Sequence, residues 1–267
     1  IDKAIYITSS TESAKQAKQQ LDALNKPCAL VDDFDKPFTL STFQSSENKF
    51  DLLDAISKLL SEDLILISTE RLFFCLLPEL QSFKNAIISL QKGADYNLLE
   101  IERKLVENGY KKVETVSARG EFAVRGDILD VFNSTSEMPV RFDFFDTNIE
   151  HIYEFDFLTF EKNATLNHFT IVPNKLLLLD SEERQNIISQ IDSQKSGNQT
   201  LTDLALSLDR GDDVPLEFLT PYTQKIETIF DLDLPIVISN SLVVEASTNR
   251  LYEQIKEKVE NIFNAEN

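Results

Sequence analysis

The sequence predicts an α/β protein in which a small β-rich domain interrupts a lobe of alternating strands and helices. Short apolar runs alternate with amphipathic stretches over the first third of the chain, a pattern typical of a parallel sheet with crossover helices. From Val113 the chain changes to closely spaced β runs with turn residues between them. After Pro173 helical patterns return, which indicates a third, α-rich segment.

The first segment has the pattern of β-α-β units. Ala14, Ala17 and Leu21 recur at helical spacing between two apolar runs, and Leu64–Ile67 is short and wholly apolar, as buried parallel strands are. The expected strands are Ala4–Thr8, Cys28–Val31 and Leu64–Ile67, and the expected helices are Thr11–Leu24, Asn48–Leu60 and Thr69–Leu77.

The middle segment begins with an amphipathic helix, Leu98–Asn108, and Gly109 is well placed to end it in the left-handed conformation. In Val140–Phe145 apolar and charged residues alternate, which predicts a strand with one face in the core and one in water. The expected strands are Val113–Val116, Glu121–Val124, Ile128–Phe132, Val140–Phe145 and Ile149–Phe155. The last segment is expected to contain a helix Ser181–Ile191, a polar loop Gln194–Gln199, a strand Ile236–Ile238 and a helix near Asn249–Phe263.

Composition limits the possible partners and compartments. The 45 acidic and 26 basic residues give a net charge of −19, so binding to nucleic acid through overall charge is excluded, while 42% hydrophobic residues indicate a folded chain. Cys28 and Cys75 have apolar neighbours and are expected to be buried thiols in a reducing, cytoplasmic compartment. No membrane span or signal segment is expected, and the start without Met suggests a piece of a longer protein.

The sequence offers no catalytic, cofactor or metal site. None of the six glycines begins a Gly-Lys-Ser/Thr phosphate loop or a Gly-x-Gly-x-x-Gly turn. His151 and His168 lack partners at the spacing of a zinc site and are expected at or near the surface, and no Gly-x-Ser-x-Gly elbow is present. We therefore expect a chain without enzymatic activity of its own.

Positive charge is concentrated in one stretch. Residues 103–125 contain six basic and three acidic side chains, whereas residues 126–161 contain one Arg and nine acidic side chains. A local excess of three positive charges on an acidic protein can steer an acidic partner, and arginine is suited to bidentate contacts with carboxylates. The alternative is that these are ordinary solvated charges at a domain boundary.

An ordered set of motifs in this region resembles a known family. Residues 120–132 read Gly-Glu-Phe-Ala-Val-Arg-Gly-Asp-Ile-Leu-Asp-Val-Phe, Gly109-Tyr110 precede them, and Pro-Val-Arg-Phe-Asp-Phe-Phe-Asp follows at 139–146 with Ile149-Glu150. This set is similar to the small β domain shared by UvrB and the transcription-repair coupling factors (Mfd), the docking surface for UvrA in both. The chain lacks the Walker A loop and the tyrosine-rich hairpin of a UvrB, so it looks like the N-terminal UvrB-homology region of a coupling factor.

The resemblance implies an organisation and a function. Residues 1–92 and 176–267 would be two parts of a degenerate, helicase-like lobe, and 93–175 the UvrA-binding β domain. The chain would recruit UvrA to lesion-stalled RNA polymerase in bacterial transcription-coupled nucleotide excision repair. The full-length parent would be a cytoplasmic, ATP- and Mg-dependent translocase on double-stranded DNA that also binds RNA polymerase. The alternative is a degenerate helicase lobe of a UvrB-like protein that contacts DNA, which the charge of −19 disfavours.

Carried over residue by residue, the resemblance assigns UvrA binding first to Arg125, the arginine of the motif. UvrB-type sequences tend to have Arg-Val-Arg where this chain has Ala123-Val124-Arg125, so Lys112 and Arg119 would compensate for one missing cation, and Lys111 is assigned to the same partner-binding set. Alternation places Phe122 and Val124 in the core, opposite Ala123 and Arg125. Gly120, Phe122, Gly126 and Asp127 are expected to shape the motif, with a positive φ at Gly126.

Overall fold

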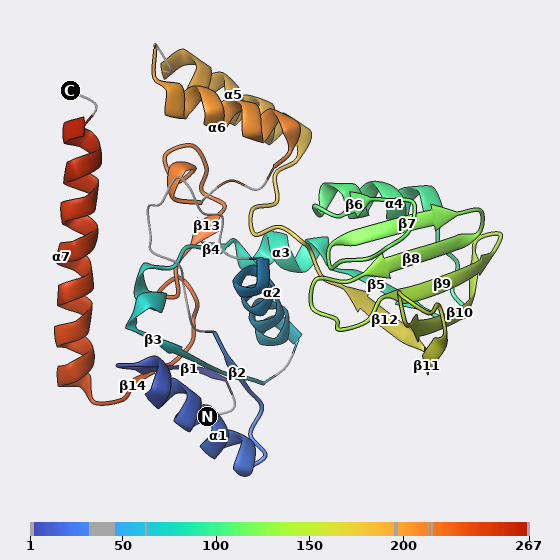
Figure 1. Cartoon of the computed structure of the whole chain (residues 1–267), viewed down its shortest axis with the longest axis horizontal. Coiled ribbons are helices and arrows are strands. Elements are labelled where there is room, and N and C mark those ends of the chain that lie inside the picture. The colour runs from blue at the N-terminus through green and yellow to red at the C-terminus, as the bar shows by residue number, and fades with distance from the viewer. Residues whose placement is uncertain are drawn as a thin grey trace. The chain divides into compact units, whose positions relative to one another are not determined.

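The computed structural model describes residues 3–31, 46–61, 63–194, 197–212, 214 and 216–265, so the predicted loop Gln194–Gln199 lies partly outside the described residues. Contacts divide the chain into two compact units, Ile1–Leu80 with Val214–Asn267, and Gln81–Asp213. The first unit is an α/β lobe and the second contains a β-rich domain (Figure 1). The mixed α/β class predicted from the sequence is confirmed, and the three-segment division at residues 92 and 175 stays a prediction.

The first unit is built on a parallel four-stranded sheet in the order β14-β1-β3-β2. Ile5 of β1 pairs with Ile236 on one side and Leu66 on the other, and it is fully buried. Ser10 begins helix α1 by accepting a hydrogen bond from the N–H of Ser13 at 3.2 Å. The elements are β1 (Ala4–Thr8), α1 (Thr11–Ala23), β2 (Cys28–Leu30), α2 (Ser46–Ser61), β3 (Ile65–Thr69), the 3-10 helix η1 (Glu70–Phe74), β4 (Leu77–Pro78), the 3-10 helix η2 (Leu216–Phe218), β13 (Ile226–Glu227), β14 (Ile236–Ile238) and α7 (Ser241–Ala265).

Two predictions for this unit are wrong. The helix expected over Thr69–Leu77 is the short η1 followed by β4, which pairs with β13. Residues 72–77 are apolar on every side, so their periodicity does not separate a helix from a strand. Cys75 is buried as expected, but Cys28 is only half-buried because β2 is an edge strand.

The second unit contains a six-stranded sheet in the order β11-β10-β9-β8-β7-β6. All its strand pairs are antiparallel except β6–β7, which is parallel. Asn97 begins helix α4 by accepting hydrogen bonds from Leu99 and Glu100 N–H groups at 3.0 and 3.2 Å. The elements are α3 (Leu80–Ala86), β5 (Ile88–Gln91), α4 (Leu98–Glu107), β6 (Lys111–Lys112), β7 (Glu121–Arg125), β8 (Ile128–Phe132), β9 (Val140–Phe145), β10 (Asn148–Phe155), β11 (Lys162–Leu166), β12 (His168–Ile171), α5 (Ser181–Gln194) and α6 (Gln199–Arg210).

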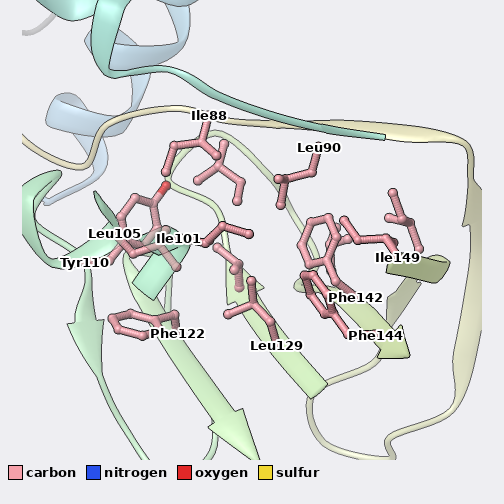
Figure 2. Packing of buried hydrophobic residues seen from close by; sticks show 14 residues of the cluster. Ile88, Leu90, Ile101, Leu105, Tyr110, Phe122, Leu129, Phe142, Phe144 and Ile149 are labelled. Carbon is pink, nitrogen blue, oxygen red and sulfur yellow. The ribbon is translucent and has the colours of Figure 1, made fainter. Parts of the chain in front are cut away.

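One face of the six-stranded sheet packs against α4 to form the main core of this unit. Phe122, Leu129 and Phe142 from neighbouring strands lie in one cluster with Ile101 and Leu105 of α4, and all five are buried (Figure 2). The alternation predicted for Val140–Phe145 is confirmed, since its apolar residues at 140, 142 and 144 are buried in this core and its charged residues at 141 and 143 are more exposed.

The opposite face is partly covered, which the sequence did not predict. The prediction of a strand at Val113–Val116 is wrong, because the strand that pairs with β7 is β6 and the residues after β6 form a loop. Val116 from this loop is buried against Ala123, Phe132 and Phe155 in a second, small cluster. Ala123 is therefore buried on the side opposite Phe122, while Val124 is only half-buried.

A buried side-chain network explains the Gly109-Tyr110 motif. Gly109 has a φ of +85° after the C-terminal end of α4, as predicted. The Tyr110 hydroxyl donates to the carbonyl of Val172 at 2.6 Å and lies 2.8 Å from Asn133 Oδ1. Burial raises the pKa of Tyr110. The motif thus ties α4 to the strand that ends at Ile171, and its role here is structural.

Candidate partner-binding surface

Two of the predicted site residues, Arg125 and Lys111, lie on the face of the six-stranded sheet that points away from α4, which we call the outer face. Strand pairing sets Ala123 opposite Asp130, Asp130 opposite Arg141, and Arg141 opposite Tyr153. Directly paired residues share a face, and residues two apart on a strand do as well. Arg125 is therefore on the outer face with this row of polar side chains.

Two arginines converge on the Asp130 carboxylate, whose side chain is 1% exposed. Arg141 binds it with two hydrogen bonds, Nε to Oδ1 at 2.6 Å and Nη2 to Oδ2 at 2.9 Å. Arg125 Nη2 donates to the same Oδ2 at 2.6 Å. The charge-assisted, forked contact fixes the plane of the Arg141 guanidinium, and the single short hydrogen bond anchors one end of the Arg125 guanidinium.

The Arg141 guanidinium also packs against an aromatic ring. Its guanidinium carbon lies 4.8 Å from the ring centroid of Phe155, at cation–π distance. The hydrogen bonds to Asp130 raise the pKa of Arg141 and outweigh the opposing effect of partial burial. The group is a permanent cation with 17% of its side chain exposed.

Arg125 is more exposed than Arg141 and is accessible to a partner. Its side chain is 42% exposed, and Nη1 makes only long contacts of 3.4 Å to the Glu114 carbonyl and Thr115 Oγ1. One edge of its guanidinium is thus anchored on Asp130 while much of the group faces solvent. A side chain fixed in this way loses little conformational entropy when it binds a carboxylate.

The structure does not bring all four predicted cations together. Lys111 shares the outer face with Arg125, because it pairs directly with Glu121 on β7. Lys112 lies on the α4 side and binds Glu102 at 2.5 Å. Arg119 lies half-buried in the loop before β7 and has interactions of its own. Arg125 and Lys111 are the pair that shares the outer face.

Comparison with known proteins identifies this part of the chain. Residues 88–177 match the family model of the UvrB interaction domain, and they lie within the second unit. This stretch of the chain therefore resembles a UvrB interaction domain. The resemblance stated from the motifs is confirmed.

Similar proteins come from two groups. Over 150 residues the chain is 34% identical to the transcription-repair-coupling factor of Bacillus subtilis (strain 168), which covers 56% of this chain and 13% of that protein. Over 115 residues it is 36% identical to UvrABC system protein B of Clostridium botulinum (strain Loch Maree / Type A3) and 33% identical to that of Carboxydothermus hydrogenoformans. These two matches each cover 43% of this chain and 17% of the relative. The aligned region thus spans less than a fifth of the length of these relatives.

The motif residues predicted to shape the UvrB interaction domain have clear positions. Gly120 and Gly126 have φ values of +82° and +60°, so the positive φ expected at Gly126 is confirmed. Phe122 is fully buried in the main core. Asp127 is exposed in the β7–β8 turn, and its carbonyl accepts the N–H of Phe144 at 2.8 Å.

Sequence reasoning missed two residues of the outer face. Arg141 anchors Asp130, and Phe145 is 71% exposed on the outer face, two residues beyond Asp143. The sequence does contain a signal for each residue. Asp130 stands between apolar residues in a strand, and a buried carboxylate there requires a partner such as Arg141. Phe145 is the next residue after Arg141 and Asp143 on the polar face of its strand. Among the described residues no helix is long and apolar enough to cross a bilayer, and no group of three metal-ligating side chains occurs.

Proposed function

We propose that this chain is a non-catalytic module of a bacterial transcription-repair coupling factor that binds UvrA in nucleotide excision repair. The UvrB interaction domain and the similarity to both coupling factor and UvrB support a UvrA-linked role. The longer match to the coupling factor and the lack of a Walker A motif favour that protein over UvrB. The recruitment of UvrA to lesion-stalled RNA polymerase follows from this assignment.

The observation that carries the proposal is the fixed, outward-facing guanidinium of Arg125. It stands on a regular strand, is anchored by a buried carboxylate and remains 42% exposed. Preorganised cations of this kind bind acidic protein surfaces, and arginine is enriched among residues that dominate binding energy. Lys111 and the exposed Phe145 extend the surface on the same face. Arg119, in the loop before β7, is a further candidate contact, whereas Lys112 points to the α4 side and is not assigned to this surface.

Further parts of the proposal concern the whole protein. The lobe formed by residues 1–92 and 176–267 would be a degenerate, helicase-like scaffold around the UvrA-binding domain 93–175. The parent would be a cytoplasmic translocase that uses ATP and Mg, moves on double-stranded DNA and binds RNA polymerase. This chain would need no cofactor for its own role.

Titration calorimetry of the chain against UvrA tests the proposal, with Arg125→Ala as the decisive variant. We expect saturable binding that Arg125→Ala weakens by about 1.5–3 kcal/mol, roughly 10- to 150-fold. Arg103→Ala is the matched control, because Arg103 is exposed on α4 at the opposite face and pairs with Glu107 in its own helix. Thermal unfolding of each variant checks the fold.

A parallel fluorescence titration with duplex DNA separates the two candidate functions. The recruiting module predicts UvrA binding and no DNA binding at physiological salt, since a net charge of −19 repels phosphate. DNA binding without UvrA binding would overturn the proposal in favour of a DNA-contacting lobe. An unchanged affinity in Arg125→Ala would refute the assignment of this residue.

A further inference from the structure

The turn between β10 and β11, residues Asp156–Glu161, exposes two large apolar side chains. Leu158 is 77% exposed and Phe160 is 50% exposed. A single exposed leucine is unremarkable on a protein surface, but two such side chains within three residues form an apolar projection. The projection calls for an explanation because nothing in the main core requires it.

The turn is held rigidly in shape. Asp156 Oδ1 accepts hydrogen bonds from the N–H groups of Leu158 and Thr159, both at 2.8 Å. The main chain closes the turn through Phe160 N–H to the Asp156 carbonyl at 2.7 Å and Asp156 N–H to the Glu161 carbonyl at 3.0 Å. Phe160 has a φ of +60°, a conformation that costs a bulky residue energy and that glycine or asparagine would adopt more easily.

The turn is continuous with the arginine surface. The Phe160 ring stacks on Phe155 with centroids 6.2 Å apart and planes 14° apart. Phe155 in turn lies beneath the guanidinium of Arg141, which shares the Asp130 carboxylate with Arg125. One chain of contacts therefore runs from the exposed apolar turn to the exposed cation.

We propose that Leu158 and Phe160 form a second contact with UvrA, in which they enter an apolar patch bordered by the carboxylates that bind Arg125. This inference rests on the proposed function and adds a determinant of affinity to it. A protein partner fits better than nucleic acid, because Asp156 and Glu161 flank the turn and would repel phosphate. An apolar anchor beside a fixed cation is the usual composition of the centre of a protein interface.

The test measures UvrA affinity of the whole chain with Leu158→Ser and Phe160→Asn, at two salt concentrations. Asn removes the ring and tolerates positive φ, while Leu158→Ser alters a side chain too exposed to support the fold. Leu99→Ser is the matched control, since Leu99 is 76% exposed on α4, which covers the other face of the sheet. We expect each turn variant to bind UvrA about tenfold more weakly than the wild type, and the control to bind with wild-type affinity. The salt dependence of binding should be the same for the turn variants and the wild type, because no charge is removed.

The outcomes separate this inference from the proposed function. Wild-type affinity in both turn variants, together with weakened binding in Arg125→Ala, overturns the turn contact and leaves the recruiting function standing. If the wild-type chain does not bind UvrA, both the turn contact and the proposed function are overturned. Sedimentation of the wild-type chain as a dimer that Leu158→Ser dissociates, with UvrA affinity unchanged, would assign the turn to a second copy of the chain and overturn the proposal.

Discussion

Asp130 and Arg141 lie directly opposite each other on β8 and β9 and form a two-pronged ion pair whose carboxylate is almost completely buried. The carboxylate also holds Arg125, the exposed cation of the outer face. One buried residue therefore stabilises the strand pair and positions the guanidinium that we assign to partner binding.

Breaking this pair is expected to destabilise the second unit strongly. Asp130→Leu removes the charge that Arg141 neutralises and should lower the free energy of unfolding by about 3–5 kcal/mol, as for other buried pairs that lose one partner. The double variant Asp130→Leu/Arg141→Met replaces both groups by apolar ones and should recover most of that loss. Urea unfolding of the two variants and the wild type gives the comparison. A single variant as stable as the wild type would contradict the prediction.

Two glycines with positive φ should respond differently to alanine. At Gly126 a Cβ meets no atom within 4 Å, so Gly126→Ala costs only backbone strain, about 1–2 kcal/mol. At Gly109 a Cβ would lie 2.3 Å from Cγ of Lys175, whose Nζ donates to the Gly211 carbonyl at 2.7 Å. Gly109→Ala should therefore lower the free energy of unfolding by about 1–3 kcal/mol more than Gly126→Ala does. Lys175→Ala in the same chain should remove that difference, and equal urea midpoints for the two single variants would argue against it.

The two cysteines should react at different stages of unfolding. Burial, reinforced by the nearby charge of Glu217, raises the pKa of Cys75 to about 12, so almost no thiolate exists at neutral pH. Cys28 is half-buried, and its pKa is raised by burial and by Asp22, to which its thiol donates a hydrogen bond. Alkylation in increasing urea, read by mass spectrometry, should modify Cys28 first and Cys75 only when the first unit unfolds. Modification of Cys75 in the native protein would show that its surroundings open more readily than the structure implies.

Periodicity predicted the regular elements well and the irregular ones poorly. The strands Ala4–Thr8, Ile128–Phe132, Val140–Phe145 and Ile236–Ile238 have the predicted bounds, because each is an alternating or largely apolar run. The two-residue strand β6 carries no such pattern, since Lys111 and Lys112 are both exposed and their pairing with β7 depends on tertiary contacts. Helix α6 begins with Gln199 after a polar loop and was overlooked despite its apolar face at Leu204 and Leu208.

The candidate site was predictable only in part. Arg125 was predicted from a motif, but its anchor Asp130 could not be predicted in the same way. The contact joins residues of β7, β8 and β9, and the register of the strands, not the spacing of residues along the sequence, brings them together. Lys112 looked equivalent to Lys111 in sequence, yet the pleat turns it toward Glu102 on α4. Which charges share a face is a property of the sheet.

The turn that presents Leu158 and Phe160 should depend on the ionisation of Asp156. Hydrogen bonds from the N–H groups of Thr159 and Leu158 lower the pKa of this carboxyl, so the charged form is favoured in the folded state. The resulting stabilisation is fully present above the unfolded-state pKa of about 3.9 and is lost as pH falls through the lower, folded-state value. In an NMR titration the Leu158 and Thr159 amide signals should therefore shift together with a midpoint below about 3.9. Asp156→Asn should abolish that step while keeping an acceptor for the turn, and a midpoint at or above the ordinary value would mean that the carboxylate does not hold the turn in solution.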